Sequence, residues 1–267
     1  MRPRLKTLTP DFVWNAGRAA YFGLLHARQW PGATFHPWRR ASIRRLEALK
    51  NHYEGERCFI LGNGPSLKHT DISKLRDEYT FGLNRIYLAF EKWGFETSFF
   101  VSVNDLVIEQ TAAEIAALKI PKFITWRARR WVPLDSDTHF LHTTYTGPKF
   151  ARDARGRLWE GATVTYIALQ LAFHMGFRQV ILIGVDHNFA TRGAPNTTIT
   201  SEGDDPDHFH AAYFGKGFRW QLPDLETSEI GYRLARRAYE RAGREVLDAT
   251  IDGKLTIFNK VDYNGLF

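Results

Sequence analysis

From residue 56 onward, short apolar runs rich in β-branched and aromatic residues alternate with longer stretches of helical character. This alternation is typical of an α/β domain built on a mostly parallel sheet, and such sheets bind ligands at the carboxyl ends of their strands. The loops after the strands are therefore the first places to look for a site. Strands are predicted at Arg57–Leu61, Thr80–Leu83, Phe99–Val103, Lys122–Thr125, Gln179–Ile183 and Arg244–Leu247, and helices at about 70–76, 85–93, 107–118, 162–176 and 227–243.

Two segments of this domain differ from the rest. Residues 162–176 are apolar on nearly all sides, so we expect a buried helix with Gly176 at its C-terminal cap. Residues 187–226 form a long polar stretch, rich in Gly, Asp and His, with little periodicity. Loops of that length in compact domains are usually functional, so residues 187–226 are predicted to form a lid.

The net charge of +7 is concentrated in the N-terminal fifth of the chain. Residues 1–50 carry a net charge of +8, whereas the remaining 217 residues carry −1. A nearly neutral body argues against a nucleic-acid-binding groove, so no nucleic-acid partner is expected. The single cysteine, Cys58, excludes a disulfide framework and a cysteine-based zinc site.

Residues 1–55 are predicted to form a basic, aromatic helical arm ahead of the α/β domain at 56–267. Two interpretations fit the arm: peripheral contact with an anionic membrane through residues 1–50, or packing on the body with its arginines facing solvent. No run of 18 apolar residues and no signal-peptide pattern are present, so we expect a cytoplasmic protein, at the inner face of the membrane if the arm binds lipid. Helices are predicted at 11–30 and 39–53, with a break between them marked by Pro31, Gly32 and Pro37.

The first chemical motif follows the first predicted strand. Gly62-Asn63-Gly64-Pro65-Ser66 lets backbone N–H groups approach an anion, and the Asn63 and Ser66 side chains add hydrogen bonds. Leu67 stands where a dinucleotide-binding motif would have its third glycine, and no lysine has the P-loop spacing. Neither of those two nucleotide folds is therefore supported, and an ordinary strand-to-helix turn is the structural alternative.

The second motif ends the strand at Gln179–Ile183. Gly184 is followed by Asp186, a carboxylate that can hold a ribose or substrate hydroxyl or act as a base. Capping of a turn is the structural alternative for this aspartate.

The third motif is the titratable cluster of the lid. Its histidines and carboxylates could ligate a metal, or a histidine could act as a general acid or base near neutral pH. No third metal ligand is fixed by spacing, so no metal site is predicted, and a solvated loop is the structural alternative. The cluster consists of Asp204, Asp205, Asp207, His208, His210, Tyr213, Lys216 and Arg219.

Four blocks together resemble a known family. They are CFILGNGPSLK at 58–68, TFGLNRIY at 80–87, FVSVNDLVIEQ at 100–110 and HMGFRQVILIGVDHNF at 174–189. They resemble the MptE-like domain group, which is similar to the bacterial sialyltransferases of glycosyltransferase family 42 and to the Maf flagellin glycosyltransferases. The resemblance covers about residues 56–250. It implies a Rossmann-like, GT-A-type domain with a lid, which transfers a nonulosonic sugar from its CMP conjugate with inversion and without a required metal.

The resemblance also implies roles for individual residues. Those expected to bind the nucleotide-sugar donor are Gly62, Asn63, Gly64, Ser66, Asn84, Asn104, Thr163, Thr165 and Tyr213. The general base would be a lid histidine, His210 in preference to His208, with Asp186 as a further catalytic candidate. The sialyltransferases hold the donor phosphate with tyrosines after the Gly-x-Asp strand. This chain has Asn188 at the first such place, so Arg192, Tyr213 or Lys216 would have to substitute.

The sequence thus predicts a glycosyltransferase that moves a nonulosonic or related sugar from a nucleotide-activated donor, CMP-linked on the resemblance, to a lipid-linked or cell-surface glycan. The main alternative is an ATP- and Mg-dependent 6-hydroxymethylpterin diphosphokinase, in which the aspartates at 204–207 would hold the metal. A non-enzymatic protein that binds nucleic acid or membrane is a third hypothesis. The glycosyltransferase would require no cofactor, whereas the diphosphokinase would require magnesium.

Overall fold

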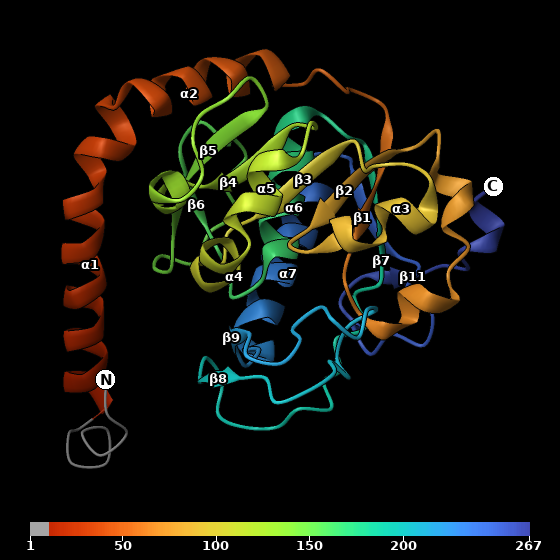
Figure 1. Ribbon diagram of the computed structural model, residues 1–267. Helices are drawn as coiled ribbons and strands as arrows, with labels where there is room; N and C mark the ends of the chain where they lie inside the picture. The colour runs from red at the N-terminus through yellow and green to blue at the C-terminus, as the bar shows by residue number, and fades with distance from the viewer. Residues whose placement is uncertain (1–10) are drawn as a thin grey trace.

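A nine-stranded sheet forms the centre of the protein in this computed structural model, which describes residues 11–267 (Figure 1). The strand order is β11-β10-β7-β1-β2-β3-β4-β5-β6, and every neighbouring pair is parallel. The predicted α/β class with a mostly parallel, Rossmann-like sheet is therefore confirmed. The strands are β1 (Arg57–Leu61), β2 (Tyr79–Leu83), β3 (Phe99–Ser102), β4 (Lys122–Thr125), β5 (Thr138–Thr144), β6 (Arg157–Trp159), β7 (Gln179–Ile183), β10 (Glu245–Asp248) and β11 (Asn259–Lys260).

Helices cover both faces of the sheet, which explains why its central strands are apolar throughout. In β1, Cys58 and Ile60 pack toward one face, and Phe59 and Leu61 pack toward the other. The first face is covered by α6 (Val164–Met175) and α7 (Leu225–Glu240). The second is covered by η2 (Pro65–His69), η3 (Ile72–Leu75), η4 (Ile86–Ala89), α3 (Phe90–Trp93), α4 (Asp105–Gln110), α5 (Ala112–Ala117), η5 (Trp126–Arg130) and η6 (Asn264–Leu266).

The predicted buried helix is confirmed as α6, in which every residue from Thr165 to Met175 is buried. Thr163 caps its start, because the hydroxyl oxygen accepts a hydrogen bond from the Thr165 amide at 3.3 Å. Gly176 ends it with a left-handed φ of +101°. A side chain at Gly176 would also lie 2.9 Å from the Asn51 Cα, so both backbone conformation and space require glycine there.

Strands β5 and β6 were not predicted, because β5 is rich in polar side chains and β6 has only three residues. β5 reads THFLHTT, yet all seven residues are buried. Buried polar groups must find partners, and one example is the Thr143 hydroxyl, which lies 2.8 Å from the Thr125 hydroxyl of the adjacent strand. The short β11 was also missed, as was the small antiparallel sheet of β8 (Thr198–Thr200) and β9 (Arg219–Gln221). The predicted helix at 107–118 is two helices, which meet at Thr111.

The direction of strand addition reverses beside β1. The chain builds β1 to β6 outward in one direction, then returns through α6 and places β7 on the other side of β1. The carboxyl ends of β1 and β7 therefore lie side by side, at a topological switch point. The amide of Gly62 donates to the Ile183 carbonyl at 2.8 Å, and the amide of Gly64 donates to the Gly184 carbonyl at 2.9 Å.

The N-terminal part forms two helices, α1 (Asp11–Phe35) and α2 (Pro37–Leu49). The break between them lies at His36, whose Nδ1 accepts from the Trp38 amide at 3.2 Å. The predicted break beginning at Pro31 was wrong, since α1 continues through Pro31 and Gly32. At this point the helix lies against the body: a Cβ on Gly32 would be 3.4 Å from the Trp126 indole nitrogen. Pro31 removes one hydrogen bond from the helix, yet α1 continues through it, and the contact with Trp126 lies at the same point.

Helix α2 packs on the body, as the second interpretation of the arm expected. The Phe140 amide of β5 donates to the Ser42 hydroxyl at 2.9 Å, and Trp38 stacks on Phe140 with ring centroids 6.0 Å apart. Leu46 is fully buried in the core. Helix α1, in contrast, runs from α2 along the outside of the molecule (Figure 1). Within residues 11–267, no helix has both the length and the apolarity needed to cross a bilayer.

Candidate functional site

The switch point is closed by a clasp between the loop after β1 and the loop after β7. One Asp186 oxygen accepts from the Ser66 amide at 3.0 Å, and the other accepts from the Ser66 hydroxyl at 2.6 Å. These are charge-assisted hydrogen bonds, and they occupy both carboxylate oxygens. The structure thus brings the predicted residues Gly62, Gly64, Ser66 and Asp186 together. In this arrangement Asp186 shapes the loop after β1, as the capping alternative described.

The clasp leaves no room for side chains on its glycines. A Cβ on Gly62 would lie 2.2 Å from the Gly184 carbonyl oxygen, and one on Gly64 would lie 1.9 Å from an Asp186 oxygen. Gly62→Ala is therefore expected to lower the free energy of unfolding by about 1–3 kcal/mol, because backbone must move to relieve the clash. Urea denaturation measures this loss. Gly203→Ala in the lid is the matched control, since nothing lies within 4 Å of its Cβ, and an equal loss in both variants would contradict the clasp.

Three asparagines line the cavity at the carboxyl ends of neighbouring strands. The Asn63 side-chain amide donates to the Leu83 carbonyl at 3.1 Å, which leaves its Oδ1 atom buried without a protein partner. Asn84 takes a left-handed φ of +48°, and its Oδ1 accepts from the Ser102 hydroxyl at 3.0 Å. Asn104 caps α4. A hydrogen-bond donor on a bound ligand would satisfy this Asn63 oxygen.

The cavity beside these loops has a volume of about 630 Å³. Its floor includes the start of α6, where Thr163 and Thr165 lie, and the buried Tyr232 of α7. Burial raises the pKa of the Tyr232 hydroxyl, while hydrogen bonds with the two threonines oppose that shift. Asp224 caps α7 at the same cavity, where its carboxylate accepts from the Thr227 amide at 3.0 Å. Two helix N-termini and several hydroxyl groups therefore border the cavity, an environment suited to anions.

Residues of the predicted lid at 187–226 line this cavity, and the segment has a small core of its own. It contains the antiparallel strands β8 (Thr198–Thr200) and β9 (Arg219–Gln221). The guanidinium of Arg85, after β2, donates to the Ala212 carbonyl at 2.9 Å and ties the lid to the body. The core of the lid packs on α4 and consists of Val107, Tyr213, Phe214, Trp220 and Leu222, with Ile199, Phe209 and Phe218 at its edge.

His208 is held in the cavity wall by this lid. Its Nδ1 lies 2.8 Å from an Asp205 oxygen, and the ring stacks on Tyr213 with centroids 4.1 Å apart at 9°. The Asp205 carboxylate is buried and also accepts from the amides of Asp207 and Phe214. Because Nδ1 faces Asp205, Nε2 is the nitrogen that remains for a substrate. A histidine oriented by a buried carboxylate is the arrangement of a general base.

The other lid candidates lie elsewhere. His210 is exposed and outside the cavity lining, and its Nδ1 accepts from the Ala212 amide at 3.1 Å. Arg192 and Lys216 are also exposed and outside the lining, whereas Tyr213 is buried within it. The Tyr213 hydroxyl accepts from the Arg85 amide at 3.4 Å. The structure therefore brings His208 and Tyr213 to the cavity that the expected donor-binding residues line, and leaves His210 at the surface.

The lid carboxylates do not fit a magnesium site. Asp207 accepts hydrogen bonds from the amides of Ala190 and Thr191. Asp205 is hydrogen-bonded to His208 and to two backbone amides, and Asp204 is exposed. Among the side chains that the structure describes, no three His, Cys, Asp or Glu residues are arranged to hold a metal ion. Mg²⁺ prefers convergent carboxylate oxygens, and here those oxygens fix the lid backbone.

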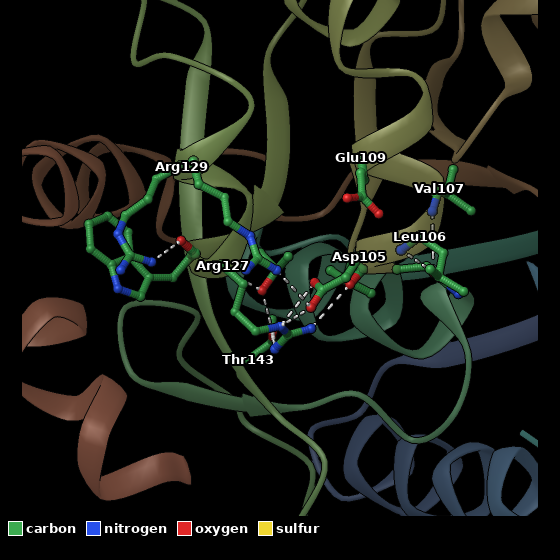
Figure 2. Close-up of polar contacts among 12 residues, drawn as sticks. Asp105, Leu106, Val107, Glu109, Arg127, Arg129 and Thr143 are labelled. Atoms are coloured by element: carbon green, nitrogen blue, oxygen red, sulfur yellow. Dashed lines mark hydrogen bonds and ion pairs between the residues drawn. The ribbon is translucent and has the colours of Figure 1, made fainter. Parts of the chain in front are cut away.

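Charged and polar side chains cluster around the buried Arg127 beside the cavity, and Figure 2 shows its contacts with Asp105 and Thr143. The Arg127 guanidinium donates to both Asp105 oxygens at 2.9 and 3.0 Å, to Glu160 at 2.8 Å and to the Tyr145 hydroxyl at 2.8 Å. It also donates to the Thr143 hydroxyl at 3.1 Å. Glu160 and Tyr145 line the cavity. Sequence reasoning missed this cluster, because Arg127 lies in the run WRARR, which reads as a solvated basic segment.

The cluster holds the turn that opens α6. Glu160 is followed by Gly161 and Ala162, both with a left-handed φ of +56°, and then by the cap Thr163. Burial raises the pKa of the Glu160 carboxyl, and Arg127 opposes that shift. Burial alone would lower the pKa of Arg127, but Glu160, Tyr145 and Asp105 outweigh it, so the guanidinium stays charged. The ion pair thereby stabilises a conformation that is unfavourable for alanine.

The cavity lining has no fixed positive charge of its own: none of the described residues around it is a lysine or arginine. Its carboxylates are Glu160, Asp186, Asp207 and Asp224, and each is already hydrogen-bonded within the protein. An anionic group in this cavity would be held by backbone amides and hydroxyls.

Comparison with solved structures supports the fold. The chain is similar to the structure of a Maf glycosyltransferase from Magnetospirillum magneticum AMB-1, with a TM-score of 0.50 and 14% identity. The match covers 85% of this chain but only 39% of that chain, so it is evidence for the fold alone. A comparison with curated proteins gives no match. The model of the family described as 6-hydroxymethylpterin diphosphokinase MptE-like matches residues 39–192, more than half of the chain. The chain therefore belongs to the MptE-like family, as the four sequence blocks predicted.

Proposed function

We propose that the protein is a glycosyltransferase that moves a sugar from a CMP-linked donor, of the nonulosonic class or related to it, to a glycan acceptor. The observation that carries the proposal is His208, held by the buried Asp205 in the wall of a cavity that the glycine loop also lines. The fold that the chain shares with a Maf glycosyltransferase supports this reaction class.

In the proposed reaction, His208 Nε2 takes the proton of the acceptor hydroxyl. The acceptor oxygen forms a bond to the anomeric carbon of the donor, and the bond from that carbon to the phosphate oxygen breaks with inversion. Asp205 stabilises the imidazolium that forms, as a carboxylate does in other histidine-based sites. The departing phosphate is stabilised by the N-terminus of α6 and by the hydroxyls of Thr163 and Thr165.

The charge of the cavity supports a donor with one phosphate group. A diphosphate ester is usually neutralised by magnesium or by Lys and Arg side chains. The described lining offers neither cationic side chains nor a set of magnesium ligands. A CMP-linked sugar carries a single phosphodiester charge, which amides and hydroxyls can hold.

The alternative reaction is diphosphate transfer from ATP, which the family description names. Its required Mg²⁺ has no suitable carboxylate set around the lid, since Asp205 and Asp207 are engaged with backbone amides. We therefore place sugar transfer first and keep ATP as a measured alternative.

Thermal unfolding with CMP, CDP, UDP, GDP and ATP, each with and without Mg²⁺, tests the proposal. CMP at 100 times its Kd is expected to add about 2.7 kcal/mol, which corresponds to about 5–10 °C in Tm for a chain of this size. The CMP effect should be the same without Mg²⁺, and cytidine should give little because it lacks the phosphate. Stabilisation by ATP with Mg²⁺ alone would overturn the proposal in favour of the alternative.

A further inference from the structure

Large apolar side chains are exposed along α1. Eight large hydrophobic side chains are exposed among those that the structure describes, and four of them lie on this helix. Tyr21 is 53% exposed, Leu24 72%, Trp30 50% and Phe35 65%. Water-facing apolar side chains gathered on one element indicate an interaction surface rather than scattered surface residues.

Three of the four exposed side chains share a helix face with a positive charge. At 100° per residue, Tyr21, Leu24, Arg28 and Phe35 fall within about 60° of one another around the α1 axis. Arg28 is exposed, and the Trp30 ring contacts the Phe35 ring edge-on with centroids 5.6 Å apart. The face thus combines aromatic, aliphatic and basic side chains, which is the composition of helices that lie in a membrane interface.

The charge of the surrounding segment favours an anionic occupant. Residues 1–50 carry a net charge of +8, against −1 for the rest of the chain. Arg40 and Arg44 of the adjacent α2 are exposed, whereas Arg45 of the same helix is used inside the molecule, where it donates to the carbonyls of Asp135 and Thr138. Exposed arginines beside an apolar face are complementary to anionic lipid headgroups.

We propose that the exposed face of α1, formed by Tyr21, Leu24, Arg28 and Phe35, docks on an anionic lipid bilayer. Tyr21 also lines the cavity. Docking on this face therefore brings the cavity to the level of the headgroups. The bilayer contact itself does not depend on the reaction. One consequence rests on the proposed function: the acceptor is a lipid-linked glycan that reaches the cavity from the membrane surface.

Sedimentation with vesicles tests the docking surface on the full chain. The unmodified protein is expected to bind phosphatidylcholine vesicles that contain 30% phosphatidylglycerol, and to bind pure phosphatidylcholine at least about tenfold more weakly. Binding to the anionic vesicles should fall as salt is raised. The double variant Leu24→Glu/Phe35→Glu should lose about tenfold or more of that binding. The matched control is Ile230→Glu, which changes an exposed apolar residue on α7.

Two further measurements make each outcome decisive. Equal binding of the unmodified chain to neutral and anionic vesicles, or retention of binding by the double variant, overturns the proposal. So does a dimer in light scattering that the double variant converts to monomer without vesicles, because a second copy would then cover the face. CMP-dependent stabilisation should be the same in the double variant and the control, so loss of vesicle binding is separable from failure of the proposed function.

Discussion

His208→Ala is expected to lower kcat for sugar transfer by about 100- to 10 000-fold, the usual contribution of a positioned general base. The substitution removes the ring nitrogen that would take the acceptor proton, and it leaves the glycine loop and the α6 cap in place. Donor binding should therefore change little, so the loss should appear in kcat more than in KM for the donor. Turnover of a CMP-linked sugar with a glycan acceptor at saturating donor measures the effect.

The chain provides a matched control two residues away. His210→Ala changes a histidine of the same lid that is exposed and outside the cavity lining, so it should keep at least half of the activity. Asp205→Asn should lose activity as well, because it removes the charge that stabilises the imidazolium. If His210→Ala were inactive while His208→Ala kept full turnover, the assignment would be reversed.

Arg127→Met should have the largest effect on stability, with a loss of about 3–5 kcal/mol in the free energy of unfolding at pH 7. The variant leaves the buried Glu160 carboxylate without the guanidinium that neutralises it. It also removes the donors to Tyr145 and Thr143. Urea unfolding curves with linear extrapolation give the loss directly.

Two comparisons show whether the unpaired carboxylate is the cause. Arg127→Met/Glu160→Gln should recover much of the loss, because a neutral side chain is far less costly to bury. Arg130→Met, at an arginine that is 60% exposed and 3.9 Å from Asp105, should change stability by less than about 1 kcal/mol. In Arg127→Met the loss should shrink as the pH falls, because Glu160 then binds a proton in the folded state and its pKa is raised by burial. A loss that is independent of pH and unrelieved in the double variant would indicate a packing defect instead.

The central strands were predictable because a sheet covered on both faces demands apolar residues at every position. All six predicted strands are present within one or two residues of the expected bounds. β5 was not predictable in this way. Thr143 pairs with Thr125 of β4 and the Phe140 amide donates to Ser42 of α2, and such partners become visible only when the chain is folded.

The location of the site was predictable to the level of loops. The strand-end rule placed the loops of Gly62 and Asp186 near one another, because parallel strands end at the same edge of a sheet, and the family resemblance added Asn84 and Asn104. The choice between the two lid histidines was not accessible from sequence. It depends on the buried Asp205 and on the aromatic core that packs the lid against α4.

The clasp between the loops after β1 and β7 has a consequence for synthesis of the chain. Ser66 and Asp186 are 120 residues apart, and all of β2 to β6 is made between them. At the usual 5–20 residues per second, the first loop waits about 6–24 s for its partner to leave the ribosome. During that interval the inner edge of β1, which later pairs with β7, has no strand beside it. Chaperone capture and misassembly should concentrate on nascent chains of this length, and slow codons placed before α6 would lengthen their exposure.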